Sequence, residues 1–201
     1  MVKRPEVRVL VVGGLERHPD GTVINATSTV TLIRGERNYL VDTGRADTGE
    51  ALLSALHRAH LEVEDINAII LTHLHSDHRG CIHLFPEAEL IVHPKEPLDV
   101  VRRNLTKAME GELEYGIYLL HTPGHTPGHI SVLVKAQRTF AICGDAIPTP
   151  LNLLKWLPPF YRFDTALSME SMRKLVQAAE FIVPGHGEVI PASLAGSERM
   201  R

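Results

Sequence analysis

The feature that most constrains this chain is a dense run of histidine and aspartate directly after a short apolar stretch. Residues 72–78 read Thr-His-Leu-His-Ser-Asp-His, and residues 69–71 before them read Ile-Ile-Leu. Such an apolar run predicts a buried strand. A strand that ends there delivers three imidazoles and a carboxylate into one small volume at the edge of a sheet. Imidazole and carboxylate together suit zinc, iron or manganese, so the run predicts a metal site rather than a solvated loop.

The spacing within this run predicts two groups of ligands. His73 and His75 lie on the same side of an extended chain, because side chains alternate along a strand. If the chain then turns into a helix at Ser76, Asp77 and His78 are directed to a second side. One short motif can therefore serve two adjacent metal ions.

A second histidine-rich segment lies in the middle of the chain. Residues 121–129 read His-Thr-Pro-Gly-His-Thr-Pro-Gly-His, and proline and glycine exclude a helix despite the four-residue spacing. We expect a rigid turn in which one of the three histidines is a ligand, and the spacing leaves open which one. His121 ends a predicted strand and is more simply structural, while His129 is placed to orient its neighbours.

Two further segments place a candidate ligand beside glycine. Asp145 ends the sequence Cys-Gly-Asp after a predicted strand, and His186 lies within Pro-Gly-His-Gly. Glycine has no Cβ, so it allows a carboxylate or a sharp loop to approach a crowded centre. Either segment alone is weak evidence, but in company with the first motif both residues are predicted ligands.

The order of predicted elements indicates the fold class. We expect strands at 7–12, 27–33, 39–41, 69–71, 90–92, 117–120, 130–134, 140–143 and 181–183, with helices that begin near Asp47 and near Thr165 or Ser168. Each half runs from strands through a helix to a strand that ends in histidine. This pattern predicts an α/β fold, an αββα sandwich formed by a single domain over residues 1–201, with the metal site at one edge of the two sheets.

Composition and charge favour an ordinary globular protein. The chain is 44% hydrophobic and 22% charged, with a net charge of −3, so nothing in its bulk charge calls for nucleic acid or an anionic membrane. Arg102, Arg103 and Lys107 form only a small basic cluster, which is weak support for nucleic-acid binding. Cys81 and Cys143 form no disulfide framework, and the N-terminus does not read as a signal peptide. We therefore expect a cytoplasmic protein with no membrane partner.

Four motifs in this order resemble the metallo-β-lactamase-fold hydrolases. They are THLHSDH, TPGHTPGH, CGD and PGHG, preceded by Val-Asp-Thr-Gly at 41–44, and the resemblance spans residues 7–191. It is greatest to the small stand-alone members of that superfamily. The resemblance implies that one metal ion is bound by His73, His75 and His125, the other by Asp77, His78 and His186, with Asp145 bridging both. It also implies that Asp42 braces the histidine loop from behind.

The function implied by this resemblance is hydrolysis. Two Zn²⁺ ions, or iron or manganese in their place, would hold a bridging hydroxide that attacks an ester, thioester, lactone or phosphodiester, with Asp77 as the catalytic group that moves a proton. The substrate is expected to be a small molecule. One alternative is a mononuclear iron dioxygenase that acts on persulfides, and another is a metal-stabilised binding module without catalysis.

The segment 151–163 is the best indication of substrate preference. It contains the only tryptophan, Trp156, together with Phe160, Tyr161 and Phe163. Because it follows Asp145 closely, we expect it to lie beside the metals. Such an apolar, proline-rich loop would form a wall of the substrate pocket, a homodimer interface or part of the core.

Overall fold

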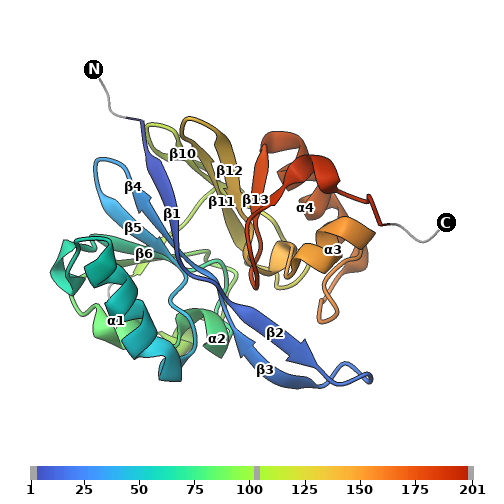
Figure 1. Ribbon diagram of the computed structural model, residues 1–201, viewed down its shortest axis with the longest axis horizontal. Coiled ribbons are helices and arrows are strands. Elements are labelled where there is room, and N and C mark those ends of the chain that lie inside the picture. The colour runs from blue at the N-terminus through green and yellow to red at the C-terminus, as the bar shows by residue number, and fades with distance from the viewer. Residues whose placement is uncertain (1–3, 102–104, 199–201) are drawn as a thin grey trace.

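The computed structural model describes residues 4–101 and 105–198, and their strands form two facing sheets and a hairpin (Figure 1). The first sheet has the order β1 (Glu6–Val11), β4 (Val30–Arg34), β5 (Asn38–Val41), β6 (Ala68–Ile70), β7 (Glu89–Val92) and β8 (Leu105–Lys107). The second has the order β14 (Ile190–Pro191), β13 (Phe181–Val183), β12 (Thr139–Ile142), β11 (Ile130–Lys135), β10 (Ile117–His121) and β9 (Gly111–Glu114). The hairpin consists of β2 (Gly14–Arg17) and β3 (Val23–Thr27).

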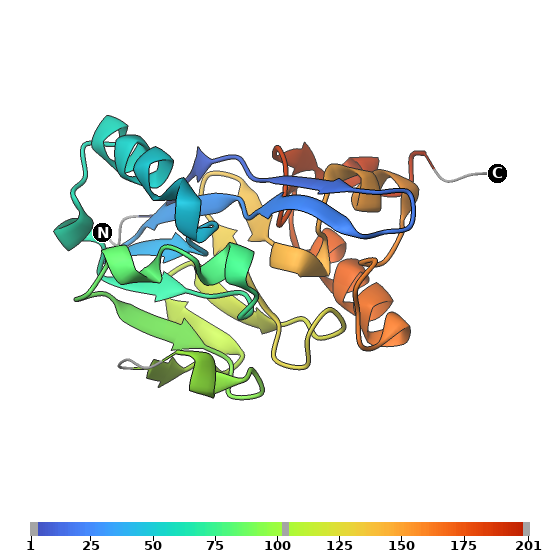
Figure 2. The same ribbon diagram turned by 90° about the horizontal axis from the view of Figure 1, so that it is seen from below.

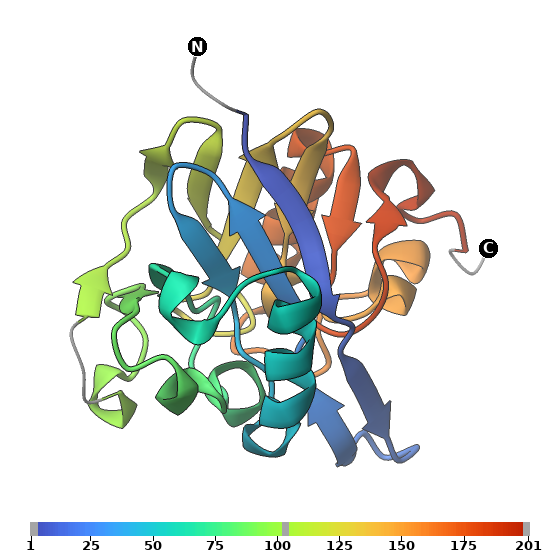
Figure 3. The same ribbon diagram turned by 60° about the vertical axis from the view of Figure 1, so that its left-hand side comes forward.

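Helices cover the outer faces of both sheets. Helix α1 (Gly49–Arg58) packs on the first sheet, as Figure 3 shows, and α2 (Ser76–Arg79) is a single turn at its lower edge. Helices α3 (Pro150–Lys155) and α4 (Thr165–Ala178) cover the second sheet. The predicted αββα sandwich is therefore confirmed. Within the described ranges, every helix is too short or too polar to cross a lipid bilayer.

Alternate residues of a strand pack into different layers of this sandwich. Leu32 and Leu40 pack in the core between the first sheet and α1, whereas Ile33 and Val41 pack in the core between the two sheets. All four are at most 1% exposed. Each fully buried aliphatic side chain contributes about 1.5–3 kcal/mol, and a shift by one residue would exchange the two faces. The sequence pattern of these strands therefore fixes how the layers stack.

The strands that precede the candidate ligands end at one edge of the sandwich. Strands β5, β6 and β7 are parallel, as are β12 and β13. Asp42 follows β5, His73 follows β6, Asp145 follows β12 and His186 follows β13. Figure 2 views the molecule from this side and shows the blue hairpin β2–β3 reaching toward the orange segment after α3. Residues that are distant in sequence are thereby gathered at one end of both sheets.

The prediction of one strand over residues 27–33 is wrong. The structure has two strands there, β3 and β4, separated at Ser28 and Thr29. The backbone N–H of Ser28 donates to the carbonyl of Asp77 (3.0 Å), and that of Thr29 donates to the carbonyl of Gly185 (2.7 Å). The break therefore ties together two loops that carry candidate ligands. Strands β2, β8, β9 and β14 are also absent from the sequence prediction.

The predicted starts of both long helices are wrong in detail. The Asp47 carboxylate pairs with Arg45 (2.6 Å) and makes no capping bond to α1. The N-cap of α4 is Asp164, rather than Thr165 or Ser168, and its side chain accepts a hydrogen bond from the backbone three residues on (2.9 Å). Several polar residues stand in a row at each helix start, and the sequence does not show which one leaves the helical conformation.

Candidate metal centre

Three histidine nitrogens converge at the lower end of the sandwich. His75 Nδ1 lies 3.0 Å from His73 Nε2 and 3.0 Å from His125 Nε2. The other ring nitrogen of His125 donates to the carbonyl of Tyr161 (2.7 Å), and that of His73 contacts the Thr72 hydroxyl (3.1 Å). A carbonyl only accepts, so His125 carries its proton on Nδ1 and directs the Nε2 lone pair inward. The arrangement is that of a three-nitrogen cation site.

A second cluster lies beside the first and contains Asp77, His78 and His186. Asp77 Oδ2 is 3.8 Å from His78 Nε2 and 3.7 Å from His186 Nε2. His186 Nδ1 donates to the carbonyl of Thr27 (2.8 Å), and His78 Nδ1 faces Asp42 Oδ2 (2.8 Å). Both Nε2 atoms therefore point into the cluster. Helix α2 begins at Ser76, and the His78 ring also lies beside His73, with ring centres 4.1 Å apart.

Asp145 lies between the two clusters. Its Oδ1 is 3.2 Å from His186 Nε2 and 3.4 Å from His78 Nε2, while its Oδ2 is 3.4 Å from His125 Nε2. Gly185 permits this approach, because a Cβ at that position would lie 2.2 Å from Asp145 Oδ1. One carboxylate thus presents an oxygen to each cluster.

Buried polar atoms without partners show that the clusters fit metal ions. Five buried side-chain atoms of the described residues make no hydrogen bond, and two of them, His78 Nε2 and Asp145 Oδ1, belong to the clusters. Unpaired buried polar groups are rare because each costs free energy. A cation would satisfy both atoms, and a set of imidazole and carboxylate donors suits zinc and its neighbours. The structure thus brings together all seven residues that the sequence nominates as ligands: His73, His75, Asp77, His78, His125, Asp145 and His186. Their role as ligands stays a prediction.

The electrostatics of the site favour cation binding. Burial, reinforced by neighbouring histidines, lowers the pKa of His75 to about 4 and holds the pKa of His73 well below its ordinary value. Both rings are therefore neutral near pH 7 with lone pairs available. Burial opposes a charge on His78, but the carboxylates of Asp42 and Asp145 outweigh it and raise its pKa. The negative charge that favours a proton on His78 also favours a metal ion there.

Asp42 braces the loop that carries the first motif. Its Oδ1 accepts from the backbone N–H of Thr72 (2.8 Å), and its Oδ2 accepts from the Thr72 hydroxyl (2.8 Å) and faces His78 Nδ1. Asp42 is 2% exposed. A buried carboxylate behind a histidine fixes the tautomer and orientation of the ring. This is the position that the resemblance implied for Asp42.

The structure separates the three histidines of the Pro-Gly turn. Only His125 lies in a cluster of candidate ligands. His129 is buried behind it, with Nδ1 2.9 Å from the Thr122 hydroxyl and its ring stacked on His73 at 5.3 Å. His121 stacks on His93 at 4.4 Å. His129 therefore supports its neighbours and His121 packs against another ring, in the positions that the sequence favoured for these two histidines.

Glu96 is a buried residue of the site that sequence reasoning missed. Its Oε2 accepts from the backbone N–H of Leu74, which lies between His73 and His75 (3.0 Å). Its Oε1 accepts from the backbone N–H of Gly128 (3.1 Å) and from the Thr126 hydroxyl. One carboxylate therefore joins the two loops that supply all three nitrogens of the first cluster. A glutamate after His-Pro-Lys carries no sequence signal for this role.

Replacement of Glu96 by glutamine is expected to weaken metal binding at the three-histidine cluster by about 10–100-fold. The amide cannot accept from all three donors, so the two loops lose their common anchor. The measurement is a stepwise zinc titration against a competing chelator, which resolves the two binding constants.

The matched control is Glu89→Gln, because Glu89 belongs to the same stretch of chain but pairs with Arg37 at the surface (2.7 Å). This variant should retain both constants. Equal zinc affinities in Glu96→Gln and the native protein would show that Glu96 does not position the ligands.

Removal of metal is expected to lower the thermal midpoint by roughly 10 °C. A ligand that binds only the folded state at about 1,000 times its Kd stabilises it by about 4 kcal/mol, and each kcal/mol shifts Tm by about 2–4 °C for this size. Calorimetry with and without a chelator measures the change, and added zinc should restore it. An unchanged Tm would mean that the clusters hold no tightly bound ion.

A cavity of about 530 Å³ opens onto the candidate ligands. Its inner wall contains His75, Asp77, His125, Asp145 and His186. Its outer wall is formed by the hairpin β2–β3 and by Tyr161. This volume lies in the range of small-molecule sites.

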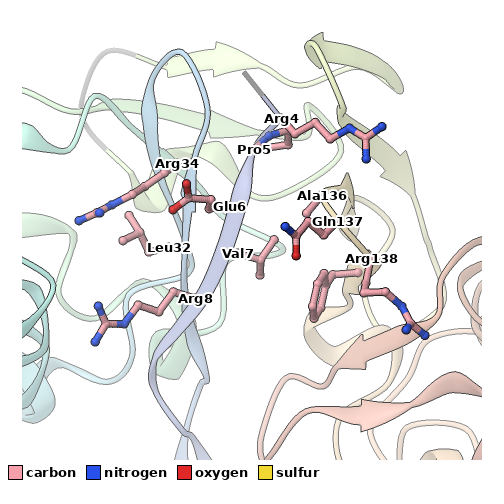
Figure 4. A pocket seen from close by; sticks show the side chains of 11 residues that line it. Arg4, Pro5, Glu6, Val7, Arg8, Leu32, Arg34, Ala136, Gln137 and Arg138 are labelled. Atoms are coloured by element: carbon pink, nitrogen blue, oxygen red, sulfur yellow. The ribbon is translucent and has the colours of Figure 1, made fainter. Parts of the chain in front are cut away.

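A larger cavity of about 820 Å³ lies elsewhere, beside β1 and the turn between β11 and β12 (Figure 4). Its lining includes four arginines, but Figure 4 shows their guanidinium groups pointing apart. Arg138 pairs with Glu180 (2.8 Å), and Arg34 donates to the carbonyl of Ala59. None of the candidate metal ligands lines this space, so size does not identify the functional cavity.

The segment 151–163 has three different environments. Its first part is helix α3 rather than a loop, and Trp156 packs against the core beneath the second sheet. Tyr161 lines the cavity, and Phe160 is 57% exposed. Arg162 donates to the carbonyl of Pro159 (2.7 Å) and so supports the loop itself. The expectation of a pocket wall therefore holds for Tyr161 and fails for the tryptophan. Two residues of the small basic cluster, Arg102 and Arg103, lie outside the described ranges.

Comparison with known proteins places these features in one family. The model of the metallo-beta-lactamase superfamily matches residues 25–112 and 94–186. A protein named probable metallo-hydrolase of Methanocaldococcus jannaschii is 32% identical, over 75% of this chain and 71% of its own. Metallo-beta-lactamase domain-containing protein 1 of Xenopus laevis is 30% identical, over 87% of this chain and 76% of its own. The chain belongs to the metallo-β-lactamase superfamily.

Solved structures agree with this assignment. A crystal structure of a quorum-quenching N-acyl homoserine lactone hydrolase superposes with a TM-score of 0.73 at 26% identity, covering 92% of this chain and 93% of that chain. A dizinc quorum-quenching lactonase superposes with a TM-score of 0.66 at 18% identity, covering 80% of this chain and 72% of that chain. With its family relatives and its histidine-aspartate clusters, the chain is a metallo-hydrolase.

Proposed function

We propose that the chain is a dinuclear zinc hydrolase of small-molecule carboxylic esters, with lactones and thioesters included. The observation that carries this proposal is the position of Asp145, which presents Oδ1 to one cluster and Oδ2 to the other. A carboxylate shared in this way is suited to hold two cations a few ångströms apart.

Two bound zinc ions would lower the pKa of a bound water to about 7 and polarise the substrate carbonyl. The remaining roles belong to side chains of the chain. Asp77 is one-fifth exposed and lines the cavity, so its carboxylate can take a proton from the attacking water or return one to the leaving group. Asp42 and Glu96 hold the ligand loops in register.

The second cluster favours two metals over the single iron of a persulfide dioxygenase. His186 Nε2 is within 3.2 Å of Asp145 Oδ1, and Asp77 Oδ2 is 3.7 Å from the same nitrogen. A mononuclear centre at the three histidines would leave this second set of inward-facing donors unused. The geometry therefore supports the dinuclear hydrolase over the dioxygenase.

The cavity and the lactonase neighbour support a small-molecule carboxylic ester as the substrate. A volume of about 530 Å³ suits a small molecule rather than a polymer. The solved relative at 26% identity hydrolyses N-acyl homoserine lactones, as its name states. The proposal for this chain extends to the ester class and not to that particular lactone.

The test is turnover of a substrate panel by zinc-loaded protein. The panel contains a γ-lactone, an acyl thioester, an aryl ester and an aryl phosphodiester. Hydrolysis of at least one carboxylic substrate is expected. Turnover of the phosphodiester alone would mean that the substrates are phosphodiesters rather than carboxylic esters. Oxygen uptake with a persulfide by iron-loaded protein, without ester hydrolysis, would establish the dioxygenase instead. Tight zinc binding with no reaction would indicate a binding module.

A further inference from the structure

The cavity beside the candidate ligands has two chemically different walls. The inner wall holds the metal-binding carboxylates and imidazoles. The outer wall, from the hairpin β2–β3, holds Leu15, Val23 and Ile24 together with the guanidinium of Arg17. The base of the hairpin lies at the candidate ligands, because the Thr27 carbonyl accepts from His186, whereas Arg17 pairs with Val23 nearer the hairpin turn. Along the hairpin, Arg17 therefore lies further from the candidate ligands than Leu15 does.

Arg17 is held in place by contacts from two segments. Its Nη1 donates to the carbonyl of Gly21 (3.0 Å), across the hairpin turn. Its guanidinium carbon lies 4.7 Å from the ring centre of Tyr161 and 5.5 Å from that of Phe160. The Tyr161 hydroxyl donates to the same Gly21 carbonyl (3.3 Å). A guanidinium stacked on aromatic rings keeps its edge free for hydrogen bonding.

Arg17 is also the cation of this cavity whose charge is not neutralised. Arg45, the other cationic lining residue, makes two bonds to the Asp47 carboxylate (2.6 and 2.7 Å). Within the described part of the chain, no carboxylate pairs with Arg17. The donors that remain after the bond to Gly21 match a carboxylate, which a guanidinium binds through two parallel hydrogen bonds.

We propose that Arg17 binds a carboxylate of the substrate, at the end remote from the bond that is cleaved. The substrate is then an acyl ester or lactone whose apolar chain lies along Leu15, Val23 and Ile24 and ends in a negative charge. Arg17 selects this class by charge, while Tyr161 and Phe160 orient its guanidinium. This inference rests on the proposed function, because the bound molecule is a substrate only if the chain hydrolyses esters. The contacts that hold Arg17 do not depend on turnover.

Binding of dicarboxylates tests the site without requiring a reaction. Zinc-loaded protein is titrated calorimetrically with dicarboxylates from glutarate to suberate, each against the monocarboxylate of the same chain length. One carboxylate can bind at the metals in both series, so the difference reports the second. At the length that spans the cavity, we expect the dicarboxylate to bind at least about tenfold more tightly.

Two variants assign the difference to Arg17. Arg17→Gln should reduce the preference for the dicarboxylate to within about twofold, and Arg17→Lys should restore part of it. Arg8→Gln removes the same charge from an exposed residue of the distant larger cavity and should keep the full preference. A preference that is absent from the native protein, or that survives in Arg17→Gln, would overturn the assignment.

A kinetic arm separates this inference from the proposed function. The ratio of kcat/KM for an ester with a terminal carboxylate to that for the uncharged ester of equal length should fall at least about tenfold in Arg17→Gln. Ester turnover with an unchanged ratio would refute the role of Arg17 and leave the hydrolase intact. Dicarboxylate selectivity without turnover of any ester would refute the hydrolase and leave the carboxylate site intact.

Discussion

Replacing Asp77 with asparagine is expected to lower kcat by at least about 100-fold while zinc remains bound. Asparagine retains a side-chain oxygen at the position that faces His78 and His186, so it keeps a donor for a metal ion. It cannot accept a proton, because an amide is not basic near neutral pH. The measurement is single-turnover kinetics on a substrate from the panel, together with zinc content.

The matched control for this variant is Asp65→Asn. Asp65 is exposed in a short 3₁₀ turn and accepts a hydrogen bond from the backbone N–H of Glu62, which asparagine can also do. It should retain full activity. Full activity in Asp77→Asn with two zinc ions bound would show that Asp77 moves no proton in the reaction.

Replacing Asp145 with asparagine is expected to weaken zinc binding at both clusters by more than about 100-fold. This exceeds the effect expected for a residue, such as Glu96, that only holds the ligands in position. Asp145 presents one carboxylate oxygen to each cluster and is 6% exposed. Loss of its negative charge also removes attraction for both cations. Competition titration with a chromophoric chelator measures the two constants, and circular dichroism verifies that the variant is folded.

The outcome for each cluster distinguishes a bridging carboxylate from an ordinary ligand. Loss of zinc affinity at both clusters agrees with the position of Asp145 between His125 and His186. Loss at only one would mean that the carboxylate serves a single ion. Unchanged affinity at both would contradict its assignment as a ligand altogether.

The fold and most of the site could be predicted from local sequence because their signals are local. The alternation that separates His73 from its neighbour Leu74 is a property of any extended chain, and the turn at Ser76 follows from the polar residues there. The buried strands are short apolar runs between polar segments. Parallel strands then bring Asp145 and His186 to the same edge as the first motif, which follows from topology.

What could not be predicted depends on contacts between distant segments. Spacing alone does not distinguish His125 from His121 and His129, and its ring is oriented by the Tyr161 carbonyl, which lies 36 residues away in sequence. Glu96 acts through donors 22 to 32 residues away. Arg17 lies in a short hairpin whose alternation is too brief to predict a strand. Spacing carries no information about such pairs.

Metal content per chain, measured by elemental mass spectrometry on protein purified without added metal, distinguishes a two-metal centre from a one-metal centre. We expect about two zinc ions per chain, because two sets of inward-facing donors share Asp145. One iron per chain would contradict this expectation, and the second cluster formed by Asp77, His78 and His186 would then need another explanation.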